Sequence, residues 1–268
     1  SMNTANTSLL SRCVLAVSCL WLGLADGRAA AQDPPPAPPA AKPARPIRIL
    51  VGGDLLPHTP LRPPEKIRDA LQKISPLLQE ADASVGNFET AIADPKEREW
   101  MRYSASPEWV GELAAAHFRA VSVANNHACD YQTRGVEDTL SSVEKAGILS
   151  IGGDAEDPWQ PRTLFERDGM RVCAVGWTTL MNGGNDSSCA RSGKIAMARP
   201  NAEGTKRAAK AVFQAKKAGC DAVVAIIHGG EEYEPQTNEV MRQARRVAEV
   251  GADAVVVAAG RAVVPWGR

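Results

Sequence analysis

The sequence predicts an α/β protein whose core strands run parallel. Short apolar runs alternate along the chain with longer stretches in which apolar residues recur at helical spacing. Such alternation is typical of parallel sheets whose strands are connected by helices. The runs that we expect to form strands cover residues 47–51, 83–85, 120–123, 222–227 and 254–257.

Helices are expected between these strands. Glycine closes three of them, at Gly147, Gly219 and Gly251, as it commonly does at helix ends. Pro63 and Pro64 stand where the first helix should begin, a position that tolerates proline. The expected helices cover residues 67–78, 107–116, 133–146, 202–218 and 236–250.

One pair of strands is expected to be antiparallel. Asp168-Gly169 separates two apolar runs, residues 163–167 and 170–175. An Asp-Gly pair in this position is a strong hairpin signal, because both residues tolerate a positive φ. The sheet region therefore combines parallel pairing with one hairpin.

The N-terminal region predicts an exported protein. Residues 1–31 read as a signal peptide: Arg12 precedes an apolar stretch, 14–24, that is short for a membrane span, and Ala29-Ala30-Ala31 suits a cleavage site. Residues 32–46 form a linker rich in proline and alanine. Residues 47–268 form the folded domain. We expect a periplasmic or extracellular location with no stable membrane span after signal removal, and a membrane tether as the alternative if the signal stays attached.

Charge and cysteine content bear on the partners of the protein and on its disulfides and metal sites. Lys+Arg and Asp+Glu both number 31, so no basic excess points to a nucleic-acid partner. Four cysteines lie outside the signal, and export permits disulfides with three possible full pairings. No C-x-x-C spacing occurs, which argues against a structural zinc site. The four are Cys129, Cys173, Cys189 and Cys220.

Polar side chains follow four of the predicted strands. The segments are Gly52-Gly53-Asp54, Asn87-Phe88-Glu89, Asn125-Asn126-His127 with Asp130 three residues on, and the segment from His228 to Tyr233. The carboxyl ends of parallel strands meet at one edge of a sheet, where α/β proteins keep their sites. One such end would mean little, whereas four in one chain point to a shared polar site.

The residue types at these ends suit divalent metals of the Mn, Fe or Zn class. Carboxylates supply charge, imidazoles favour transition metals, and an amide oxygen completes a shell without charge. Two such ions clamp a phosphoryl-type group and lower the pKa of bound water. The predicted ligands are Asp54, Glu89, Asn126, His127 and His228, and the predicted catalytic residues are His127, His228 and Glu232.

Structural roles are the alternative for each of these residues. His127 with Asn126 would cap a turn, Asp54 would be a turn residue, and His228 a satisfied core histidine. Asp130 either orients His127 or begins the next helix. Cys129, next to the predicted site, reads as a small buried hydrophobe.

The same motifs resemble the bacterial capsule-synthesis CapA family, which is linked to poly-γ-glutamate production and is similar to calcineurin-like metallophosphoesterases. They occur in the family's order between residues 47 and 257. The resemblance implies a layered α/β/β/α sandwich of the metallophosphoesterase type, with the site above the sheets.

Two departures from the family pattern stand out. The residue after His228 is Gly229, where the family usually has tryptophan. Residues 258–262 stand where a further histidine-rich motif is expected, and no histidine follows His228. We therefore expect a fold that is incomplete at the C-terminus, by truncation or by loss of part of a metal site.

The leading hypothesis is an exported, metal-dependent hydrolase-like protein of capsule or poly-γ-glutamate metabolism. Its partner would be an anionic cell-envelope polymer or the machinery that makes it, and Glu232 would assist proton transfer. Two alternatives remain: a non-catalytic accessory or polymer-binding protein, and an inactive truncated fragment.

Overall fold

Two four-stranded sheets form the centre of the structure, a computed structural model that describes residues 45–57, 63–94, 102–185, 187–230 and 238–258. All of these residues fall in one unit, Ala40–Arg268. The first sheet has the order β1-β2-β5-β6, and every neighbouring pair in it is parallel. Its strands are β1 (Ile49–Asp54), β2 (Ala83–Asn87), β5 (Ala120–Ser122) and β6 (Leu149–Ile151).

The second sheet has the order β10-β9-β8-β7. Only its β7–β8 pair is antiparallel, and the others are parallel. Asp168 and Gly169 have φ values of 53° and 76° between β7 and β8, which confirms the predicted hairpin. The strands are β7 (Arg162–Arg167), β8 (Met170–Thr178), β9 (Ala222–His228) and β10 (Ala254–Ala258).

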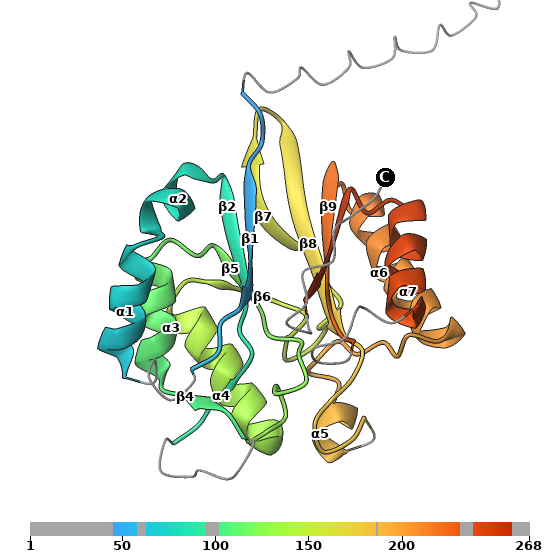
Figure 1. The fold of residues 1–268 in the computed structure, drawn as a ribbon. Helices are drawn as coiled ribbons and strands as arrows, with labels where there is room; N and C mark the ends of the chain where they lie inside the picture. The colour runs from blue at the N-terminus through green and yellow to red at the C-terminus, as the bar shows by residue number, and fades with distance from the viewer. Residues whose placement is uncertain (1–44, 58–62, 95–101, 186, 231–237, 259–268) are drawn as a thin grey trace, which may run out of the picture. The chain divides into compact units, whose positions relative to one another are not determined.

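Helices cover the outer face of each sheet (Figure 1). The second sheet is covered by α6 (Ala202–Lys217) and α7 (Asn238–Glu249). The first sheet is covered by α1 (Pro64–Gln72), α3 (Pro107–Ala115) and α4 (Gln132–Lys145), with α2 (Ser75–Glu80) following α1. The remaining elements are the strand pair β3 (Ala91–Ile92) and β4 (Ser104–Ala105), and the short α5 (Ser188–Arg191).

The inner faces of the two sheets pack on each other. One apolar cluster joins Val85 and Ile151 of the first sheet to Leu164 and Ile226 of the second. Separate apolar clusters lie between each sheet and its helices. The order of layers is therefore helix, sheet, sheet, helix, which confirms the α/β/β/α sandwich that the sequence predicts.

The prediction of one helix over residues 67–78 is wrong. The structure ends α1 at Gln72 and begins α2 at Ser75. Pro76 explains the break, because proline has no backbone N–H and its ring collides with the carbonyl four residues earlier. The strand β6 and the β3–β4 pair were not predicted.

Two disulfides select one of the three possible pairings. Cys173 on β8 is bonded to Cys220, just before β9, and Cys129 is bonded to Cys189 on α5. Cys129 is therefore a disulfide partner and not simply a small buried hydrophobe, as its sequence context suggested.

Within the described residues, we find no helix that combines the length and the apolar character needed to cross a bilayer. The predicted signal peptide, and the predicted linker up to residue 44, lie outside the described residues. The boundaries of these segments stay predictions.

Candidate active site

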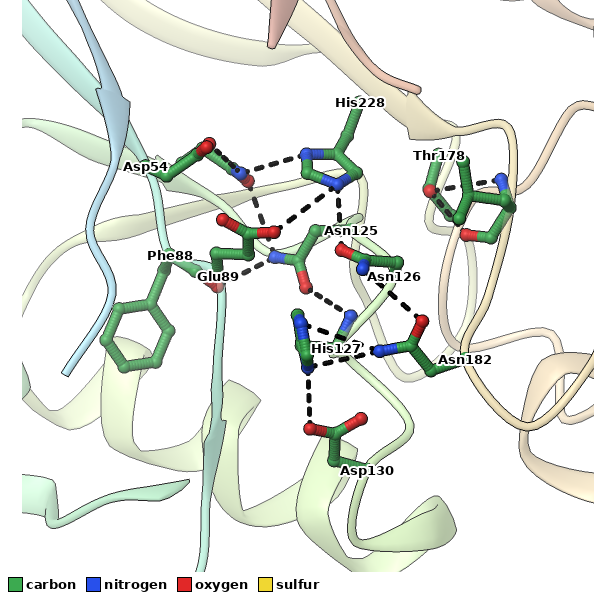
Figure 2. Close-up of polar contacts among 12 residues, drawn as sticks. Asp54, Phe88, Glu89, Asn125, Asn126, His127, Asp130, Thr178, Asn182 and His228 are labelled. Carbon is green, nitrogen blue, oxygen red and sulfur yellow. Dashed lines mark hydrogen bonds and ion pairs between the residues drawn. The ribbon is translucent and has the colours of Figure 1, made fainter. Parts of the chain in front are cut away.

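Residues that follow strands of both sheets meet in one hydrogen-bonded network (Figure 2). Asp54 ends β1, Asn87 ends β2, and the two are paired in the strand register. The Asn87 Nδ2 atom lies 2.8 Å from Asp54 Oδ1 and 3.0 Å from Nδ1 of His228, which ends β9. Asn87 therefore links the first sheet to the second.

The other nitrogen of the His228 ring lies near two further predicted site residues. Its Nε2 atom lies 2.8 Å from Asn126 Oδ1 and 3.7 Å from Glu89 Oε1. His228 is only 2% exposed. Burial lowers the pKa of His228 from 6.5 to about 4; the nearby Asp54 carboxylate raises it and His127 lowers it further. The imidazole is therefore neutral at physiological pH.

The neighbours of His228 also define its tautomer. Asn87 Nδ2 has two hydrogens, one directed at Asp54 and one at His228 Nδ1. Nδ1 accepts this hydrogen bond, so the ring proton lies on Nε2 and is donated to Asn126 Oδ1. Both ring nitrogens are thus satisfied within the protein.

His127 is oriented by a carboxylate. Its Nδ1 atom lies 2.7 Å from Asp130 Oδ2, and Asp130 also accepts a hydrogen bond of 2.8 Å from the Tyr103 backbone N–H. The Tyr103 ring packs edge-on against the imidazole, with 4.5 Å between ring centroids. Asp130 precedes α4, so of its two predicted roles the structure shows the orienting one.

Asn125 shapes the loop that carries His127. This fully buried side chain donates from Nδ2 to the Phe88 carbonyl at 2.7 Å, and its Oδ1 accepts from the His127 backbone N–H at 3.1 Å. The loop after β5 is thereby tied to the loop after β2. This arrangement turns Asn126 toward His228 and His127 toward Asp130 (Figure 2).

Asn182 was missed by the sequence analysis. The predicted strand stopped at residue 175, whereas β8 continues to Thr178, next to the end of β9. Asn182 lies in the loop that follows. Its backbone N–H donates to the Asn126 carbonyl at 2.9 Å, and its Nδ2 lies 3.2 Å from His127 Nδ1. Trp177 and Thr178, residue types that are enriched in strands, were the signal for this fifth strand end.

The structure explains the glycine after His228. A Cβ atom at Gly229 would lie 1.9 Å from Thr179 Oγ1 and 2.9 Å from Thr179 Cβ. The Thr179 backbone N–H donates to the His228 carbonyl at 2.8 Å, so these segments cannot separate freely. Close approach of the segment after β8 therefore requires glycine here.

The predicted metal ligands are gathered in this network. Ligand atoms about 2.1 Å from one ion lie roughly 3–3.5 Å apart. The separations of His228 Nε2 from Asn126 Oδ1 and Glu89 Oε1, 2.8 and 3.7 Å, bracket that range. Among the described residues, however, no three His, Cys, Asp or Glu side chains form a group that could hold an ion. The imidazole of His228, the carboxylate of Glu89 and the amide of Asn126 are of the types that bind divalent metals.

Glu232, a predicted catalytic residue, lies outside the described residues, and so does His58. His117, which is not part of the network, is exposed on the loop between α3 and β5. The described site therefore rests on Asp54, Glu89, Asn126, His127 and His228, supported by three further asparagines, Asn87, Asn125 and Asn182.

The layered fold, with imidazole, carboxylate and amide groups at its strand ends, is of the metallophosphoesterase type. The family model described as "Bacterial capsule synthesis protein PGA_cap" matches residues 48–263, and the chain belongs to this family.

Curated relatives agree with the family. The chain is 29% identical over 197 residues to "PGA biosynthesis protein CapA" of Bacillus subtilis (strain 168), an alignment that covers 69% of this chain and 49% of the relative. It is 26% identical over 191 residues to "Capsule biosynthesis protein CapA" of Bacillus anthracis, covering 68% and 46%. The chain thus spans about half the length of these relatives.

Proposed function

We propose that this protein is an exported, metal-dependent hydrolase of capsule or poly-γ-glutamate metabolism that acts on an anionic cell-envelope polymer. The names of the Bacillus relatives support the polymer, and the network around His228 supports the chemistry. The observation that carries the proposal is the meeting of Glu89, Asn126 and His228, from separate strand ends, at ligand-like separations.

His228 Nε2, Glu89 Oε1 and Asn126 Oδ1 would hold a divalent ion, with Asp54 beyond the other edge of the imidazole. A bound ion of this kind polarises the scissile bond and lowers the pKa of a water molecule. The neutral state of His228 suits ligation, because only neutral imidazole binds a metal. Binding through Nε2 would require the ring proton to move to Nδ1, and Asn87 would then no longer donate a hydrogen bond to that atom.

The charge of the network favours a cation. It contains the carboxylates of Asp54, Glu89 and Asp130. An anionic substrate group entering this site would meet the negative charge of these carboxylates. A divalent cation offsets that charge, which supports the metal-dependent proposal.

His127 would transfer the proton to the leaving group. Asp130 accepts from Nδ1–H and leaves Nε2 as the nitrogen that would exchange a proton, so the carboxylate orients the ring for this role. Tyr103 holds the ring from its edge. His127 was predicted as both ligand and catalyst; a carboxylate partner on Nδ1 orients the ring in either role, and we assign it the second.

Two disulfides support export. Disulfides persist in the oxidising compartments outside the cytoplasm and are rare inside it. Both Cys129–Cys189 and Cys173–Cys220 join segments that are distant in sequence. An enzyme that acts on an envelope polymer would also work outside the cytoplasm.

The test compares the full chain with His228→Gln and with His117→Asn, a histidine control outside the network. Metal content after loading with Mn²⁺ or Zn²⁺, and hydrolysis of a phosphodiester reporter and a γ-glutamyl oligomer, would be measured. We expect the wild type and His117→Asn to bind metal and turn over one substrate, and His228→Gln to do neither. Equal metal content in all three proteins would refute the proposal.

A non-catalytic role is the second candidate. The observation in its favour is that both His228 ring nitrogens are hydrogen-bonded within the protein, to Asn87 and Asn126. In that case the chain would retain poly-γ-glutamate in the presence of chelator and hydrolyse neither substrate. Chelator-sensitive turnover would exclude this candidate.

A further inference from the structure

The segment after β8 crosses from the second sheet to the apolar core beside the first. Met181 and Cys189 are buried in the cluster that contains Ala128, Cys129 and Val136. Two glycines with positive φ, at positions 183 and 184, turn this segment, and Asn185 Oδ1 accepts from the Met181 backbone N–H at 2.7 Å. The segment is therefore folded onto the loop that carries His127.

Asn182 makes a two-sided contact with that loop. Its backbone N–H donates to the Asn126 carbonyl, and its Oδ1 accepts from Asn126 Nδ2 at 3.3 Å. Its own Nδ2 lies 3.2 Å from Nδ1 and 3.5 Å from Nε2 of His127. A nitrogen at comparable distances from both ring nitrogens lies over the ring, so Asn182 limits rotation of the imidazole that Asp130 orients.

The Cys129–Cys189 disulfide joins the same two segments covalently. Cys129 is two residues beyond His127, and Cys189 is seven residues beyond Asn182. Both cysteines are at least 95% buried. Without the bond, a few hydrogen bonds and the packing of Met181 would have to hold the segments together, although His127 and Asn182 are 55 residues apart in the chain.

We propose that the Cys129–Cys189 disulfide is a positioning clamp that holds Asn182 against His127 and Asn126, and that Asn182 is a positioning residue for the imidazole. The consequence for catalysis rests on the proposed function of His127. The positioning itself can be measured without metal or substrate, so the two proposals can fail separately.

The second disulfide is a matched control. Cys173–Cys220 closes a segment of 47 residues and Cys129–Cys189 one of 60. In the loop-entropy model, bonds that close such similar lengths stabilise a chain almost equally. Cys173–Cys220 joins β8 to the entry of β9 within the second sheet and touches no residue of the network.

The experiment compares ¹⁵N-labelled full chain with the pairs Cys129→Ala/Cys189→Ala and Cys173→Ala/Cys220→Ala, all in chelator. We expect the first pair to speed hydrogen exchange of the Asn182 amide by about tenfold or more and to shift the His127 ring ¹⁵N signals. The second pair should leave both readouts as in the wild type. Unchanged readouts in the first pair, or equal changes in both, would overturn the clamp.

A third variant still tests the proposal if the Cys129→Ala/Cys189→Ala protein does not fold. Asn182→Ala retains both disulfides and removes only the side chain over the imidazole. We expect it to shift the His127 ring ¹⁵N signals while the melting temperature stays near that of the wild type. His127 signals identical to those of the wild type would show that Asn182 does not position the ring.

Discussion

The Nε2 atom of His228 lies 2.8 Å from the side-chain oxygen of Asn126, and this contact joins the two sheets of the sandwich at their strand ends. His228 closes β9 of the second sheet, whereas Asn126 follows β5 of the first. Each residue is adjacent in sequence only to a strand of its own sheet. The site therefore exists only because the sheets pack face to face.

Stability should depend on the protonation of His228. Its pKa is about 4 in the folded chain against an ordinary value of 6.5, so between these values the unfolded chain binds more protons. The free energy of unfolding should therefore fall as the pH is lowered from 6.5 toward 4, by on the order of 3 kcal/mol. Urea titrations in chelator would measure this.

Other groups also titrate in that range, so the informative quantity is the difference between variants. His228→Gln should lose this contribution to the pH dependence, and His117→Asn should keep it. A pH profile of His228→Gln parallel to that of the wild type would contradict the buried, neutral state of His228.

Glu89→Gln should weaken metal binding. The substitution keeps the shape of a side chain that is 11% exposed but removes the charge 3.7 Å from His228 Nε2. We expect affinity for Mn²⁺ or Zn²⁺ to fall by about 10- to 100-fold, the range typical of altered groups around a metal site. Titration calorimetry would measure it, with exposed Glu249→Gln on α7 as the control. Equal affinities would remove Glu89 from the proposed ligands.

Asp130→Asn should separate proton transfer from metal binding. The substitution removes the carboxylate that orients the His127 ring, so turnover should fall by about 10²- to 10⁴-fold, while metal content stays unchanged. Metal analysis and single-turnover rates on the same preparation would test this. If metal content fell together with the rate, His127 would act as a ligand rather than as a proton donor.

Gly229→Ala should destabilise the fold through Thr179. The added methyl group would meet Thr179 Oγ1 and Cβ at 1.9 and 2.9 Å. We expect a loss of about 1–3 kcal/mol in the wild type and a much smaller loss in a Thr179→Gly background. Urea unfolding of the four proteins would measure the coupling. Additive effects would show that another contact excludes a side chain at position 229.

The alternation of strands and helices could be predicted because hydrophobic periodicity is a local property of the sequence. The hairpin at Asp168-Gly169 is an example, since the turn chemistry is contained in two residues. The break before Ser75 was equally local and was overlooked, although Pro76 signalled it. Strand β6 has only three residues and presents too short a pattern to be recognised.

The residue types of the candidate site were also visible in the chain. Parallel strands place their carboxyl ends at one edge, so Asp54, His127 and His228 were expected to lie near one another. The partners of these residues could not be predicted. Asn182 follows a strand whose predicted end was too early, and its contact with His127 joins residues 55 positions apart.

The sequence by itself determined the alternating α/β architecture, the polar strand ends and the family, because these depend on residue type and spacing along one dimension. Only the tertiary structure decided which cysteines pair, why position 229 is glycine, and that His228 is buried and neutral. These features arise where segments far apart in the chain meet, and the packing of two separate sheets brings those segments together.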